Sequence, residues 1–147
     1  MIKYDFGGWL DPLDETFVVV DIIGNDEFRT GYDNELIRSD ISCENLMLPE
    51  KSDFINMSQV LRAIDNDKMK NVANNVDQNL ITSGTVRIFD YINPCERLLK
   101  EFMKLDYLMK SCKQINYYGD DPDMSIEYHW DYLVILQKIG DRNDKMP

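Results

Sequence analysis

Apolar and polar positions along this chain recur with periods that are typical of both helices and strands. The clearest helical period runs through residues 93–112, where apolar side chains recur at alternating spacings of four and three: Leu98, Phe102, Leu105, Met109 and Cys112. Asn93 and Glu96 have the spacing of a capping box, and Pro94 suits a first helical turn. The pattern predicts one helix over residues 93–112 that packs on a sheet.

Shorter segments rich in β-branched and aromatic residues are expected to form strands. They are residues 17–23, 27–30, 85–91, 114–118 and 125–139, with a further broken strand inside 35–48. The alternation of apolar and polar residues over 126–132 predicts a half-buried strand that pairs with residues 114–118 as a hairpin. Pro122 and Gly140 stand where a helix would begin and end, so a helix over 125–139 is the alternative.

Residues 52–82 are predicted to be helical, either as one bent helix or as two short ones. The break is expected at residues 65–67, because Asp and Asn side chains compete for backbone hydrogen bonds. Residues 1–15 are expected to be an irregular lead-in and residues 141–147 a flexible tail. The whole chain, residues 1–147, is thus predicted to be a single α+β domain. It has a mostly antiparallel sheet with two or three helices packed on one face.

Negative charge is the strongest global property of the sequence. Twenty-seven acidic and sixteen basic residues give a formal net charge of −11, and the first fifty residues hold twelve of the acids. Such a chain repels nucleic acid and anionic membranes and attracts basic surfaces. We see no signal peptide and no apolar stretch long enough to span a membrane, and the three cysteines lack paired spacing. These features favour a cytoplasmic protein.

Sequence motifs for catalysis are absent, including glycine-rich phosphate loops and the common hydrolase and metalloprotease motifs. Cys95 lies in a predicted first helical turn, which favours a thiolate, and His129 is the single histidine. Nothing in the sequence places these two residues together. The acidic turn at 120–123, with Glu127, lacks the ligand spacing of a calcium loop, so we expect a solvated turn. The sequence therefore predicts no catalytic residue, no metal and no cofactor.

Aromatic and acidic residues are intermingled near both ends of the chain, and we interpret them as a surface that binds a basic protein. Aromatic side chains are enriched at interfaces, and neighbouring carboxylates can meet Lys and Arg of a partner. The predicted binding residues are Trp9, Asp11, Asp14, Glu15, Asp120, Asp121, Asp123, Glu127, Tyr128, Trp130 and Asp131. The alternative is that one face of a hairpin is core and the other is solvated.

The small size, the charge and the absence of catalytic motifs resemble the general character of immunity proteins for secreted bacterial toxins, although no motif carries this resemblance. We therefore expect a non-enzymatic acidic inhibitor whose carboxylates replace phosphates in the cleft of a basic partner, such as a nuclease toxin. Three alternatives stay open: a phage-type DNA mimic that inhibits a host defence enzyme, a small enzyme or ligand-binding domain, and a structural subunit. The sequence does not determine the oligomeric state.

Overall fold

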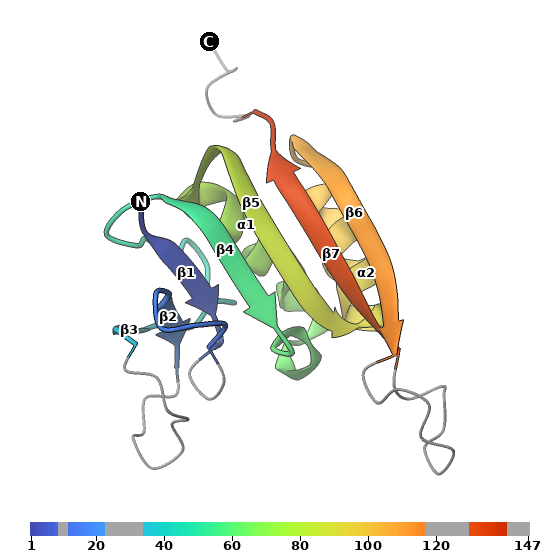
Figure 1. The fold of residues 1–147 in the computed structure, drawn as a ribbon, viewed down its shortest axis with the longest axis horizontal. Helices are drawn as coiled ribbons and strands as arrows, with labels where there is room; N and C mark the ends of the chain where they lie inside the picture. Colours follow the sequence, from blue (N-terminus) through green and yellow to red (C-terminus); the bar gives the residue numbers. More distant parts are fainter. Residues whose placement is uncertain (9–11, 23–33, 117–129, 141–147) are drawn as a thin grey trace.

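The computed structural model describes residues 1–8, 12–22, 34–116 and 130–140, which form one twisted sheet with helices behind it (Figure 1). The strands are β1 (Lys3–Phe6), β2 (Val18–Asp21), β3 (Leu36–Arg38), β4 (Ser52–Ser58), β5 (Leu80–Tyr91), β6 (Tyr107–Asn116) and β7 (Trp130–Lys138). The helices are α1 (Met69–Asn79) and α2 (Ile92–Phe102), preceded by the short 3₁₀ turns η2 (Leu61–Ala63) and η3 (Asn66–Lys68).

The seven strands are ordered β3-β2-β1-β4-β5-β7-β6. The first five are parallel to one another, and β7 runs antiparallel to both β5 and β6. The chain starts at β1, moves outward to β3, and then returns to place β4 on the other side of β1. The sheet therefore has a topological switch point between β1 and β4, as in doubly wound folds.

The expectation of a mostly antiparallel α+β sheet is wrong because two central strands have no clear sequence pattern. β1 lies inside residues 1–15, which were expected to be irregular, and it has only four residues with Asp5 among them. β4 lies inside the expected helical region 52–82, where the helix starts only at Met69. Without these two strands the parallel centre of the sheet cannot be recognised from local patterns.

The predicted helix over 93–112 is correct only in its first half. Helix α2 ends at Phe102, after which the backbone N–H groups of Lys104 and Leu105 donate to carbonyls three residues earlier and close the last turn. Residues 107–116 then form β6, and Met109 is 47% exposed. The residue that caps α2 is Tyr91, without a side-chain capping bond, so the apparent capping box at Asn93 is not used.

Three other strand predictions are confirmed. The apolar segment 17–23 contains β2, which is buried throughout, and residues 85–91 belong to β5. The segment 125–139 contains β7, which forms the expected antiparallel hairpin partner of β6. The expected strand at 27–30 and the expected tail at 141–147 lie outside the described residues.

Both long helices cover the same face of the sheet (Figure 1). Alternate residues of the central strands point towards them and are fully buried, including Tyr4, Phe6, Ile55, Met57, Val86 and Ile88. From the helices, Val76 and Leu98 complete this core, and the aromatic ring of Phe102 lies 4.8 Å from that of Tyr107. Among the described residues, no helix is long and apolar enough to cross a membrane.

Candidate functional site

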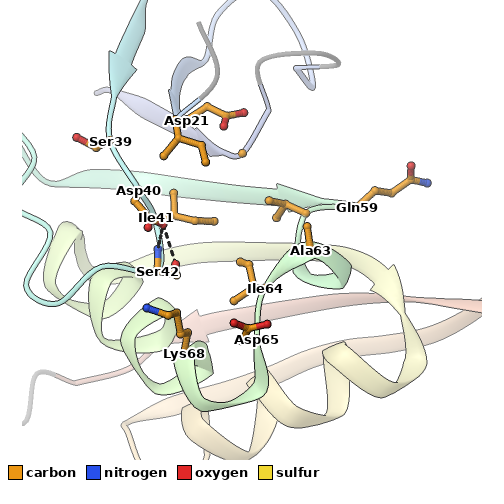
Figure 2. A pocket seen from close by; sticks show the side chains of 13 residues that line it. Asp21, Ser39, Asp40, Ile41, Ser42, Gln59, Ala63, Ile64, Asp65 and Lys68 are labelled. Carbon is orange, nitrogen blue, oxygen red and sulfur yellow. Dashed lines mark hydrogen bonds between the residues drawn. The ribbon is translucent and has the colours of Figure 1, made fainter.

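A cavity of about 490 Å³ lies where β1 to β4 end at their carboxyl termini (Figure 2). Each strand contributes a residue at or just after its end: Gly7 after β1, Asp21 at the end of β2, Asp40 after β3, and Gln59 after β4. In open parallel sheets, the crevice beside the switch point is the usual place for ligands. The size also suits a small organic ligand.

The walls of the cavity are largely apolar and come from two separate segments. Ile41 faces the space from the loop that follows β3, while Ala63 and Ile64 face it from the segment between β4 and α1 (Figure 2). Ile22 and Val60 extend these apolar surfaces. Apolar walls of this kind can pack against a flat ring system, such as a nucleobase.

Charged groups in the described lining are mainly carboxylates. The lining contains three carboxylates, from Asp21, Asp40 and Asp65, and one ammonium group, from Lys68. Asp40 accepts hydrogen bonds from the backbone N–H of Ser42 at 2.9 Å and from its hydroxyl at 2.7 Å. These bonds, with a smaller contribution from Lys68, lower the pKa of Asp40 below its ordinary value. The lining therefore favours a cationic or neutral ligand over an anionic one.

The glycines after β1 are required by close packing. Gly7 has a φ of +76°, and a Cβ placed there would lie 2.2 Å from a methyl carbon of Val60. A Cβ on Gly8 would lie 2.4 Å from the carboxyl carbon of Asp5, which is fully buried. Asp5 in turn accepts a hydrogen bond from the backbone N–H of Leu13 at 2.7 Å and so holds the β1–β2 connection against the sheet.

The connection between β1 and β2 is short. Its described residues, 7, 8 and 12–17, form turns and bends. They offer no helix N-terminus, which is the feature that binds the pyrophosphate of a dinucleotide in many doubly wound folds. The described part of the site thus has the location of a nucleotide pocket without that phosphate-binding helix.

Cys95 does not have the environment of a reactive nucleophile. Its side chain is completely buried and its thiol lies 3.5 Å from the backbone carbonyl oxygen of Asp90. Burial raises the pKa of the Cys95 thiol to about 12, and the charge of Asp90 adds to this. The neutral thiol is therefore the favoured form, and the possible partner His129 lies outside the described residues. No cluster of metal-ligating side chains occurs in the described part of the chain.

Of the predicted partner-binding residues whose side chains the structure describes, none lines this cavity. Of them, Glu15 is exposed, Asp14 is half-buried and Asp131 is 2% exposed within β7. Trp130 begins β7, but its side chain is outside the description. The remaining residues lie outside the described residues: Trp9, Asp11, Asp120, Asp121, Asp123, Glu127 and Tyr128. Their grouping as a binding surface stays a prediction.

The sequence-based search missed the residues that define the cavity. One usable signal was present, because Asp21 ends the most apolar strand of the chain and Gly7 follows a short strand. In doubly wound folds, an acidic residue placed after the glycine turn commonly binds ribose hydroxyls. The signal was not recognised because the connection lacks a repeated glycine motif.

Comparison with known proteins finds similarity in structure but not in sequence. No protein-family profile matches the sequence, and no curated protein matches it. Among solved structures, the N-methyltransferase NodS from Bradyrhizobium japonicum, in complex with S-adenosyl-L-homocysteine, superposes with a TM-score of 0.69 at 14% identity over 92% of this chain and 76% of that one.

The chain shares the Rossmann-like fold of these enzymes. A second match is an S-adenosylmethionine-dependent methyltransferase from Clostridium acetobutylicum, with a TM-score of 0.65 at 13% identity over 94% of this chain and 84% of that one. A third is magnesium protoporphyrin IX methyltransferase from Synechocystis, with bound S-adenosylmethionine, with a TM-score of 0.64 at 9% identity over 94% and 70% of the two chains.

These matches overturn the expectation of a non-enzymatic immunity protein that acts as a toxin inhibitor. That expectation rested on size, charge and missing motifs, whereas the three matched structures that share this fold are all methyltransferases. The alternative of a small enzyme or ligand-binding domain agrees better with the structure.

Proposed function

We propose that this chain is an S-adenosylmethionine-dependent methyltransferase that binds its cofactor in the cavity at the carboxyl ends of β1 to β4. The observation that carries the proposal is the placement of Asp21 and Asp40 at the ends of adjacent parallel strands, beside the switch point. The fold likeness to proteins that hold S-adenosylmethionine or S-adenosylhomocysteine supports it.

The residues of the cavity suit the chemical groups of this cofactor. Carboxylates accept hydrogen bonds, so Asp21 would accept them from the ribose hydroxyls, as the acidic residue of doubly wound folds does. Asp40 would accept one from the exocyclic amine of the adenine. Ile41 and Ile64 would pack on the two faces of the base. When bound, S-adenosylmethionine supplies a methyl group that is activated by its sulfonium centre.

The negative charge of the cavity favours binding of S-adenosylmethionine over binding of a dinucleotide. Three carboxylates and one ammonium group in the described lining favour a ligand with a positive sulfonium centre. The same carboxylates would repel a pyrophosphate, and the described β1–β2 connection has no helix N-terminus to offset that repulsion.

Isothermal titration calorimetry with S-adenosylhomocysteine, S-adenosylmethionine and NAD⁺ tests the proposal. We expect saturable binding of the first two ligands and no measurable binding of NAD⁺. Asp21→Asn should weaken binding of S-adenosylhomocysteine by tenfold or more, because a hydrogen bond to a charged group contributes about 1.5–3 kcal/mol.

The matched control is Asp53→Asn, which changes an exposed carboxylate near the opposite end of β4. It should leave the affinity within about twofold, since Asp53 does not line the cavity. Absence of binding by the folded wild-type protein, or equal losses in the two variants, would contradict the proposed site.

A further inference from the structure

Three of the four asparagines of helix α1 recur at spacings of four: Asn71, Asn75 and Asn79. This spacing places them on one face of the helix. Asparagine is a weak helix former, so these residues do not favour the helix by themselves. In the structure their amide groups serve as hydrogen-bonding partners for residues 41–48, a loop that forms no helix or strand of its own. We call these three residues the asparagine ladder.

Asn75 is the centre of the asparagine ladder and is 1% exposed. Its side-chain NH₂ group donates to the carbonyl oxygen of Ile41 at 2.9 Å and to that of Cys43 at 2.7 Å. Its side-chain oxygen accepts from the backbone N–H of Leu46 at 2.9 Å. One side chain thus supplies three of the backbone partners that regular secondary structure would otherwise supply.

Two residues of the asparagine ladder, Asn71 and Asn75, form hydrogen bonds with residues that line the cavity. Ile41 and Ser42 both line it, and Asn71 donates to the carbonyl oxygen of Ser42 at 3.1 Å. Ser42 in turn donates its N–H and its hydroxyl to the carboxylate of Asp40, as the dashed lines in Figure 2 show. A continuous set of hydrogen bonds therefore joins α1 to the carboxylate in the cavity.

Asn79 has similar chemistry but different partners. It is 3% exposed, and its side-chain NH₂ group donates to the carbonyl oxygens of Leu46 at 2.9 Å and Asn75 at 2.7 Å. Its oxygen accepts from the N–H of Leu48 at 3.1 Å. None of these partners lines the cavity. The chain thus contains a built-in control for Asn75.

We propose that Asn71 and Asn75 are positioning residues that hold the cavity wall at residues 40–42, and that ligand affinity depends on them, whereas Asn79 contributes to folding alone. The dependence of ligand affinity rests on the proposed function. The positioning of the wall does not, because all of these hydrogen bonds are made within the chain. These two parts can therefore be tested separately.

The experiment compares Asn75→Asp with Asn79→Asp. Aspartate keeps the size and the accepting oxygen, but it replaces a donating NH₂ group that faces two carbonyl oxygens, and this loss is the same in both variants. We expect similar decreases of Tm. The Kd for S-adenosylhomocysteine should rise tenfold or more in Asn75→Asp and less than threefold in Asn79→Asp. Asn71→Ala, which removes one hydrogen bond from a half-buried residue, is the milder variant if Asn75→Asp does not fold.

A double-mutant cycle distinguishes positioning from general loss of stability. If Asn71 acts through Asp40, then Asn71→Ala should weaken ligand binding several-fold in the wild-type background and hardly at all in an Asp40→Asn background. Fully additive effects on affinity would overturn the inference.

Hydrogen exchange of the ligand-free protein tests the wall itself. The backbone N–H of Ser42 should exchange faster in Asn71→Ala and Asn75→Asp but not in Asn79→Asp, after correction for global stability. Equal exchange in all three variants would overturn the inference even if the ligand binds. If the wild-type protein does not bind S-adenosylhomocysteine, the proposed function fails, while the exchange result still decides whether the asparagine ladder holds the wall.

Discussion

Lys138 of strand β7 has a buried ammonium group whose loss should have a large and measurable effect. Its side chain is 1% exposed, and its Nζ donates to the carbonyl oxygens of Asp77 at 2.8 Å and Leu80 at 3.0 Å, at the end of α1. The same Nζ lies 3.3 Å from the Asp77 carboxylate, which also accepts from the hydroxyl of Tyr107 at 2.9 Å. Lys138 thus ties the end of α1 to strand β7, which lies between β5 and β6.

The effect of Lys138→Met follows from these contacts. Methionine keeps the apolar part of the side chain, but the carbonyls of Asp77 and Leu80 lose a donor and the Asp77 carboxylate loses its countercharge. Each buried group that loses its partner costs about 1–3 kcal/mol, and the 15% exposure of Asp77 lets water recover part of the loss. We therefore expect the free energy of unfolding to fall by about 2–4 kcal/mol.

Urea unfolding followed by circular dichroism measures this change, with the slope of the transition as a check that the unfolded state is unaltered. Lys104→Met is the control, because Lys104 is 67% exposed and pairs with Glu101 at the surface, where loss of such a pair costs under about 1 kcal/mol. A buried charge also has a desolvation cost that methionine would remove. An unchanged or raised stability in Lys138→Met would show that this cost exceeds the value of the contacts, and would refute the reasoning.

Two further predictions concern stability. Because burial raises the pKa of Cys95 to about 12, the unfolded thiol ionises first as pH rises above its ordinary value of 9.0. The free energy of unfolding should therefore fall between pH 9 and 12, by at most about 1.4 kcal/mol per pH unit from this thiol. Cys95→Ala should reduce the slope of the urea midpoint plotted against pH. An unchanged slope would contradict the raised pKa of Cys95. Gly7→Ala should lower Tm because of the positive φ of Gly7 and the contact of the added Cβ with Val60. Adding Val60→Ala to this variant should restore part but not all of the lost Tm, and full restoration would show that the positive φ carries no strain.

Elements with a strong local pattern could be predicted from the sequence. The apolar run that forms β2, the alternation in β7 and the β6–β7 hairpin follow from side-chain periods that reflect burial within a few residues. Helix α2 was predicted but extended too far, because Leu105, Met109 and Cys112 continue the helical spacing by coincidence. Periodicity alone cannot show that Met109 lies on a strand with nearly half of its side chain exposed.

The candidate site could not be predicted in the same way. Gly7, Asp21 and Asp40 belong to three different strand ends, and no spacing in the sequence relates them. The role of the asparagines of α1 could not be predicted either, because it consists of hydrogen bonds to residues about thirty positions earlier in the chain. Such contacts have no local signature.

The sequence by itself determined the acidic character of the chain, the apolar strand β2, the presence of helix α2 and the final hairpin, since each depends on neighbouring residues. Only the tertiary structure decided that β1 lies between β2 and β4 and that the central strands are parallel. The physical reason is that parallel pairing joins segments that are distant along the chain. The same pairing brings four strand ends together, and with them the cavity and the proposed function.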